Sequence, residues 1–202
     1  MKKVVLGLLS VIFIGIGCSE SQKQQSPVIP TTSSLSTNVL VMEGDTPLIS
    51  ASKRGDVKAA KALLASGADV NATNAKGFTP LMVASQEGNV DVINVLATDK
   101  KIDLEAMNWN ADTALLIAVQ NNRLEAVKTL LNIGAQPNYA KAGMTVLIAA
   151  SYKGNPDIVR ALLEAGADPN MVDENNESAL DVAINTNKPA VVAVLREYQS
   201  KK

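Results

Sequence analysis

The sequence predicts an all-α solenoid of about five helix-turn-helix repeats. Three observations predict it. A seven-residue segment (heptad) of similar sequence recurs five times at intervals close to 33 residues. Each heptad is followed at a fixed distance by Gly or Asn, the residues that end helices in a left-handed conformation. A second run then follows, with apolar residues three and four positions apart, as a one-faced helix requires.

The first seventeen residues, 1–17, indicate a secretory signal peptide. Lys2 and Lys3 precede the apolar run 4–16, and the small residue Gly17 follows it. The run is too short for a membrane span, which needs about 20 apolar residues. A buried helix is the alternative, but a polar stretch follows directly.

Residues 15–18 read "GIGC" and resemble the lipobox of bacterial lipoproteins, although Gly15 stands where that family usually carries Leu. The resemblance implies that Cys18, the only cysteine, is acylated and becomes the first residue of the mature chain. An ordinary cleaved signal is the alternative. Ser19 follows the cysteine, which by the same resemblance favours the outer membrane of a bacterial cell envelope, facing the periplasm.

Residues 18–41 are interpreted as a lipidated, disordered tether. They are rich in Ser, Gln, Thr and Pro and show no helical or strand period. The tether is expected to hold a folded domain, residues 42–202, away from the bilayer.

The repeats of this domain begin near residues 46, 79, 113, 145 and 178, with successive spacings of 33, 34, 32 and 33. The first helix of each repeat is expected in "TPLISAS", "TPLMVAS", "TALLIAV", "TVLIAAS" and "SALDVAI". The expected left-handed caps are Gly55, Gly88, Asn122, Gly154 and Asn187. The second helices are expected in "VKAAKALL", "VDVINVL", "LEAVKTLL", "PDIVRALL" and "PAVVAVL".

This sequence pattern and its period resemble those of the ankyrin repeat, over residues 46–198. The resemblance implies units of one turn and two short helices that bury a continuous face by stacking. The His that normally follows "TPL" is absent, and its place is taken by Ile49, Met82, Leu116, Ile148 and Asp181. Packing is therefore expected to replace a polar link in four units. Asp181 and Arg196 are expected to give the last unit the polar face of a terminal cap.

The composition argues against catalysis. The chain has no histidine, which excludes a Ser–His–Asp triad and the usual Cys/His zinc sites. It has no phosphate-binding glycine motif, and its net charge of −1 gives no electrostatic reason to expect nucleic acid. Residues 173–177, "DENNE", suit either a weak cation site or a solvated turn, and Asp69, Asp103 and Asp168 are interpreted as turn residues. No catalytic residue, metal or cofactor is predicted.

Binding is therefore expected on the surface. In the family that the repeats resemble, loop tips and inner-helix ends form a concave strip where partners usually bind. The tip candidates are Lys76, Trp109, Asn110, Lys141, Met144, Glu174 and Asn175. The helix-end candidates are Lys53, Arg54, Gln86, Glu87, Gln120, Asn121, Tyr152 and Lys153. These residues vary between units while the frame does not.

Trp109, the only tryptophan, is the first candidate for partner contact, and Tyr152 is the second. The alternative for Trp109 is that its ring folds back over the neighbouring loop. Phe78, Tyr139 and Tyr198 are interpreted as structural. The lysines and Arg54 either form a basic stripe along the strip or are solvated charges that tune the association rate.

The leading functional hypothesis is a monomeric, lipid-anchored module that binds an envelope or periplasmic protein on its concave face. A narrower alternative is an immunity or inhibitor lipoprotein that neutralises a toxin or an envelope hydrolase. Others are a helper of a periplasmic stress enzyme and a structural envelope protein. A carboxylate-based enzyme or small-molecule binder is the remote alternative.

Overall fold

The computed structural model describes residues 44–200 of the 202-residue chain. The predicted signal peptide 1–17, Cys18 and the tether 18–41 lie outside the described residues. Within residues 44–200 no helix is long and apolar enough to cross a bilayer.

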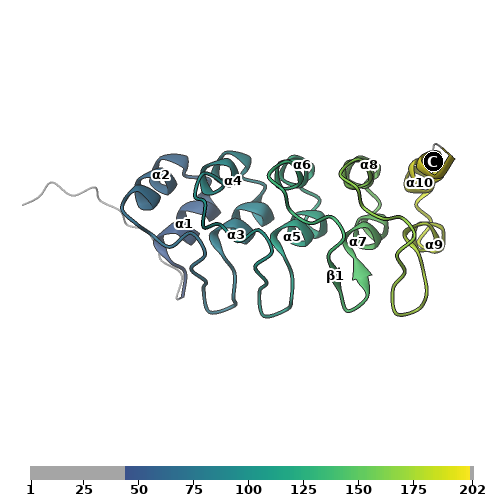
Figure 1. The fold of residues 1–202 in the computed structure, drawn as a ribbon, viewed down its shortest axis with the longest axis horizontal. Helices are drawn as coiled ribbons and strands as arrows, with labels where there is room; N and C mark the ends of the chain where they lie inside the picture. The colour runs from purple at the N-terminus through teal and green to yellow at the C-terminus, as the bar shows by residue number, and fades with distance from the viewer. Residues whose placement is uncertain (1–43, 201–202) are drawn as a thin grey trace, which may run out of the picture. The chain divides into compact units, whose positions relative to one another are not determined.

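The described residues form five helix pairs that stack in chain order, as the sequence predicts. The inner helices are α1 (Pro47–Arg54), α3 (Pro80–Glu87), α5 (Ala114–Gln120), α7 (Val146–Lys153) and α9 (Ala179–Asn185). The outer helices are α2 (Val57–Ala65), α4 (Val90–Leu96), α6 (Leu124–Asn132), α8 (Pro156–Glu164) and α10 (Pro189–Ser200). Each helix packs against its partner and against its counterpart in the next pair. Figure 1 shows the two rows, with long loops projecting from the side of the inner row that faces away from the outer helices.

The repeated Thr or Ser that opens each heptad is the N-cap of an inner helix. Its hydroxyl oxygen accepts a hydrogen bond from the backbone N–H three residues later, at 3.1–3.3 Å. Such a bond pairs one of the N–H groups that a helix start leaves without a partner. The capping residues are Thr46, Thr79, Thr113, Thr145 and Ser178. The five heptads recur because every inner helix needs the same start.

The predicted left-handed caps are confirmed. Gly55, Gly88 and Gly154 have φ of 69°, 81° and 84°, and Asn122 and Asn187 have φ of 57° and 54°. Asn is one of the few residues other than Gly that adopts this conformation at little cost.

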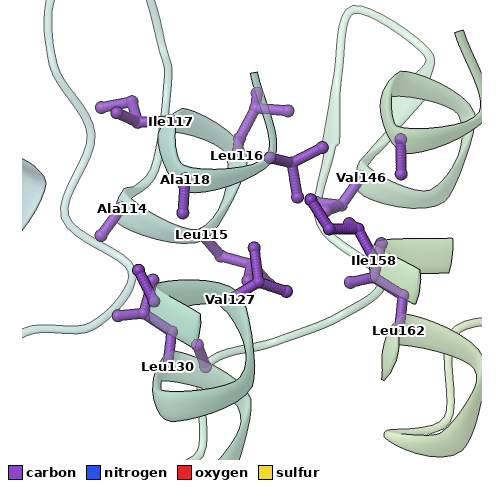
Figure 2. Packing of buried hydrophobic residues seen from close by; sticks show 14 of the residues in the cluster. Ala114, Leu115, Leu116, Ile117, Ala118, Val127, Leu130, Val146, Ile158 and Leu162 are labelled. Carbon is purple, nitrogen blue, oxygen red and sulfur yellow. The ribbon is translucent and has the colours of Figure 1, made fainter. Parts of the chain in front are cut away.

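The core is a continuous layer of aliphatic side chains between neighbouring helix pairs. Figure 2 shows it between the third and fourth pairs, where Leu115 and Val127 lie near Val146 and Ile158. Four of the residues that replace the family's His are fully buried, namely Ile49, Met82, Leu116 and Ile148. Packing at that position is therefore as predicted.

The last pair carries the expected polar face. Asp181 and Arg196 are exposed. The Asp181 carboxylate accepts hydrogen bonds from the Ser178 hydroxyl at 2.6 Å and from the Ser178 backbone N–H at 2.9 Å. These bonds hold the pKa of Asp181 below its ordinary value of 3.8, because they favour the charged form.

Two short strands were not predicted from the sequence. β1 (Ala140–Lys141) and β2 (Met144–Thr145) pair antiparallel in the loop before α7. The turn between them places Ala142 at φ 45° and Gly143 at φ 77°. Two consecutive left-handed residues make the tight turn that suits a hairpin, and two-residue strands are too short to show an alternating pattern.

Polar side chains tie each pair to the one before it. The Asn89 amide donates to the Ser52 carbonyl at 2.7 Å, and the Arg123 Nε donates to the Gln86 carbonyl at 3.0 Å. The Asn155 amide donates to the Asn122 side chain at 2.7 Å. All three donors stand at the start of an outer helix, so these bonds fix the angle between neighbouring pairs.

We expect opposite effects from removing two hydroxyls that occupy the same repeat position. The Ser85 Oγ donates to the Leu81 carbonyl at 2.7 Å, whereas the buried Ser151 Oγ has no hydrogen-bond partner. Ser85→Ala should therefore cost about 1 kcal/mol. Ser151→Ala should stabilise the fold by about 1 kcal/mol, because an unpaired buried hydroxyl is removed. Urea unfolding measures both, and equal losses in the two variants would contradict the assignment.

A second pair of variants tests the loop turns. Gly77 has φ 76°, and a Cβ there would lie 3.0 Å from the Trp109 ring and backbone nitrogen. Ala111 occupies the equivalent place with φ 57°. Gly77→Ala should cost about 2 kcal/mol through strain and collision. Ala111→Gly should leave stability within about 0.5 kcal/mol, because relief of the left-handed cost offsets the added chain entropy. Thermal unfolding that ranks the two variants the other way would refute this account.

Candidate functional site

The loops and the inner helices together form one surface, which we call the groove surface. Its geometry is visible at the last pair, where the Asn185 amide of α9 donates to the Glu177 carboxylate of the preceding loop at 2.5 Å. Glu177, the residue just before the N-cap of α9, therefore faces the last turn of that helix. All fifteen sequence-predicted binding residues belong to these loops and helix ends.

A hollow of about 290 Å³ lies on the groove surface at the first two pairs and brings four of those residues together. The predicted residues are Lys53, Lys76, Gln86 and Glu87. Asp45, Asn74, Ala75, Phe78 and Val83 complete the lining. Phe78 is half-buried and packs against the core, as predicted.

The hollow carries two charges of each sign. Both carboxylates accept a hydrogen bond from a neighbouring amide, Asp45 from Asn74 at 2.7 Å and Glu87 from Gln86 at 3.1 Å. Lys53 and Lys76 are exposed. In the described part of the chain, ion pairs form at Lys128, Lys141 and Arg160 and at none of these four side chains. The formal charges of the lining therefore sum to zero.

The sequence left two interpretations of Trp109 open, an exposed ring and a ring that folds back over the neighbouring loop, and each holds in part. Its indole Nε1 donates to the Ala75 carbonyl at 2.9 Å, so the ring does lean back over the neighbouring loop. The residue is nevertheless 75% exposed. The ring is held in one orientation with most of its surface facing solvent.

Lys141 differs from the solvated charge that the sequence predicted. Its ammonium group lies 2.7 Å from the Asp112 carboxylate, and the side chains are only 34% and 10% exposed. Asp112 belongs to the previous loop, so the ion pair joins two loops. Lys141 therefore does not belong to a stripe of free basic groups.

The exposed large hydrophobic side chains of the described residues all lie on loops or inner helices. Those predicted from the sequence are Trp109, Met144 and Tyr152, the last 62% exposed. Met107, Val172 and Ile184 were missed. Met107 and Val172 stand at the same place in their repeats as Tyr139, which was interpreted as structural, so the repeat pattern carries no signal that these two side chains are exposed.

The other predicted residues are scattered along the groove surface. Arg54, Asn110, Asn121, Lys153, Glu174 and Asn175 are exposed, and Gln120 is half-buried. The Asn121 amide donates to the Ile117 carbonyl of its own helix at 2.8 Å. The Glu174 side chain lies close to Gly143 of the preceding loop.

Several aspartates of the loops outside the hollow act as turn residues. Asp69, Asp103 and Asp168 each accept a backbone N–H two residues later, as predicted. Asp173 accepts the backbone N–H groups of Asn175 and Glu177, which is the solvated-turn reading of "DENNE". Among residues 44–200 no three potential metal ligands gather.

Two tyrosines are structural, as expected. The Tyr139 hydroxyl donates to the Ala111 carbonyl at 2.6 Å, and the Tyr198 hydroxyl donates to the Leu163 carbonyl at 3.2 Å. Each bond joins consecutive repeats, which explains why these side chains do not face a partner.

Comparison with known proteins agrees with this architecture. The model of the ankyrin repeat family matches in three copies, over residues 29–108, 73–141 and 115–202. The human transient receptor potential cation channel subfamily A member 1 is 30% identical over 151 residues, which are 74% of this chain and 14% of that protein. Its Caenorhabditis elegans homolog is 32% identical over 112 residues, which are 55% of this chain and 9% of that protein.

This chain thus spans less than a sixth of the length of either relative. The family match runs through all five helix pairs, with capped inner helices and stacked outer helices in each. The chain belongs to the ankyrin repeat family.

Proposed function

We propose that this protein is a monomeric scaffold that holds a protein of the bacterial envelope on its groove surface, while an acylated Cys18 anchors it to the membrane. Ankyrin repeats are protein–protein interaction scaffolds and are typically non-catalytic, which supports the first part. The sequence "GIGC" and the apolar run before it support the second.

The observation that carries the binding proposal is where large apolar side chains are exposed. Five of the six lie on the loops before α5, α7 and α9 or on α7, and none lies on an outer helix in the described part of the chain. The sixth, Ile184, lies at the end of the stack, where no further pair covers it in the described residues. Exposed apolar area confined to one face marks an interaction site, because scattered exposure would fall on both faces. Trp109 and Tyr152 are of the types that dominate binding energy when a partner buries them.

The structure around Trp109 also favours binding. The indole is tethered to Ala75, and its backbone N–H reaches the Lys76 carbonyl at 3.4 Å. The next loop is fixed by the pair of Lys141 and Asp112. A partner that docks on these side chains would lose little conformational entropy from the scaffold, which is the advantage of a pre-organised surface.

The anchor assigns the location. Lys2 and Lys3, the apolar run 4–16 and Cys18 direct the chain across the inner membrane and attach it by lipid. Ser19 favours delivery to the outer membrane. Several acyl chains are what stable anchoring needs, since a single chain binds a bilayer only marginally.

Replacing Trp109 should weaken partner binding enough to lose capture and should leave the fold intact. Trp109→Ala should weaken affinity about 30-fold, equivalent to about 2 kcal/mol. Tyr152→Ala should weaken it less. Affinity purification from solubilised envelopes identifies the partner by its loss in the Trp109 variant, and calorimetry with that purified partner measures the change.

Lys61→Ala is the matched control, because Lys61 is exposed on the outer helix α2. Trp109→Phe keeps an aromatic ring but removes the indole bond to Ala75, and it separates ring contact from ring placement. A set of co-purified proteins that is the same for wild type and Trp109→Ala would refute the groove surface as the binding face.

Mass spectrometry of the mature N-terminus tests the anchor. We expect the chain to start at Cys18 and to carry diacylglycerol on the thiol and a further acyl chain on the amino group. Cys18→Ser should leave an unprocessed precursor. A mature chain that begins elsewhere, or at an unmodified Cys18, would show an ordinary signal peptide instead.

A further inference from the structure

We propose that the first helix pair lies against an anionic phospholipid surface through Lys58 and Lys61 of α2, and that this contact sets how the anchored stack is oriented at the membrane. The inference rests on the proposed function, because the acylated Cys18 brings the stack to a bilayer. It adds a second contact with that bilayer, which nothing in the family match assigns.

The side chains at these two repeat positions reach each other. Glu125 and Lys128 hold the same positions in α6, and Asp157 and Arg160 hold them in α8. In both helices the two side chains form an ion pair, with a nitrogen–oxygen distance of 3.0 Å. In α2 both positions carry lysine. Residues three apart on a helix are neighbours on its surface, so the two ammonium groups of α2 lie on one side of the helix.

The two lysines have no ion-pair partner among the described residues. Both are exposed, and the ion pairs within residues 44–200 form at other side chains. Asp56, the acidic residue nearest to them in the sequence, uses its carboxylate to cap α2 and accepts the Ala59 backbone N–H at 2.9 Å. Like charges on one side of a helix repel each other, so an anion outside the protein would be stabilising at α2.

The charge of the first repeat differs from that of the second. Residues 46–78 carry five basic and two acidic side chains, whereas residues 79–112 carry two basic and six acidic ones. The five basic side chains of the first repeat are all exposed, namely Lys53, Arg54, Lys58, Lys61 and Lys76. Fewer residues separate Cys18 from this repeat than from any later one. The positive end of the stack is therefore the end closest in sequence to the proposed anchor.

The second repeat indicates a surface and not a polyanion that runs along the stack. Asp91 takes the place of Lys58 in α4 and is exposed. A nucleic acid that followed the outer helices would meet negative charge one repeat further on and would be repelled there. A bilayer can meet the end of the stack alone, and its anionic headgroups attract each lysine that lies near them.

Contact at α2 leaves the groove surface free. The helix α2 belongs to the outer row, whereas the loops project from the far side of the inner row (Figure 1). A stack that rests on the bilayer by α2 therefore turns its loops away from that bilayer. In this orientation a protein partner can reach Trp109 and Tyr152.

The test measures how fast single lysines react with a membrane-impermeant ester that acetylates amines. Full-length mature protein is added from detergent to preformed vesicles of phosphatidylcholine, either alone or with about a third phosphatidylglycerol. Peptide mass spectrometry follows each lysine. We expect the anionic vesicles to slow acetylation of Lys58 and Lys61 about fivefold. Lys128, which holds the position of Lys61 in α6, should react at the same rate on both kinds of vesicle. Salt at about 0.5 M should remove the difference, because it screens exposed charges.

Two variants locate the effect. Lys58→Glu gives α2 the acid–base pair that α6 and α8 carry, so this variant should fold and should lose the slowing at Lys61. Arg196→Glu makes the same change of net charge on α10, at the other end of the stack, and should keep the slowing at both lysines. Circular dichroism melting checks that both variants fold.

Four results would overturn the inference. Lys58 and Lys61 could react at equal rates on the two kinds of vesicle, or Lys128 could be slowed as much as they are. The slowing at Lys61 could survive in the Lys58→Glu variant. Glycerophosphate in solution, at the phosphate concentration of the anionic vesicles, should protect neither lysine, and equal protection would indicate a general anion site instead of a lipid surface.

Sedimentation with the neutral vesicles tests the anchor separately, because an acylated protein binds them without help from charge. Protein that does not sediment with neutral vesicles, but whose two lysines are protected on anionic ones, would contradict the anchor alone. Protein that sediments with both kinds of vesicle, and whose two lysines react equally on both, would contradict this inference alone.

Discussion

The contact between each inner helix and the next one is the interaction on which the structure depends. One position shows it directly. Ser52, Ser85, Val119 and Ser151 occupy the same place in the first four inner helices and are completely buried. Ile184 occupies that place in the last one and is 48% exposed, because no further pair covers it in the described residues. Burial here is supplied by the neighbour and not by the pair itself, so a single pair would leave its apolar face in water.

This dependence explains how the repeated cap and core residues that build the stack (the frame) are separated from the residues of the proposed binding surface. Cap residues such as Thr79 and the buried leucines around Leu81 repeat because every inner helix needs the same N-cap and the same packing contact with its neighbours. The residue after that buried position points away from the neighbouring pair. Lys53 and Tyr152 share this place in their repeats, and both are exposed. The stack can therefore present charge at one end and aromatic surface further along without a change to its packing.

The frame could be predicted from the sequence because its signals are local and repeated. The N-caps, the left-handed Asn122 and Asn187, and the turn role of Asp69 each depend on residues within one repeat. A pattern that agrees in five copies is a stronger signal than a single motif. The same comparison placed Ile49 and its equivalents in the core despite the missing His.

The details of the candidate site could not be predicted in the same way. Whether the Trp109 ring faces solvent or a neighbour depends on a bond to Ala75 in another repeat. The pairing of Lys141 with Asp112 also crosses repeats, and nothing in either repeat alone indicates it. The hollow depends on how closely the loop at Asn74 lies over α1 and α3, which is a property of the stacked structure.

The polar ties at the starts of α4, α6 and α8 have a direction with consequences for biosynthesis. Asn89, Arg123 and Asn155 each donate backward to an oxygen of the pair that precedes them in the chain. A nascent chain emerges from its N-terminus, so these three acceptors exist before their donors have been translated. Each of these outer helices can therefore start against a pair that is already complete.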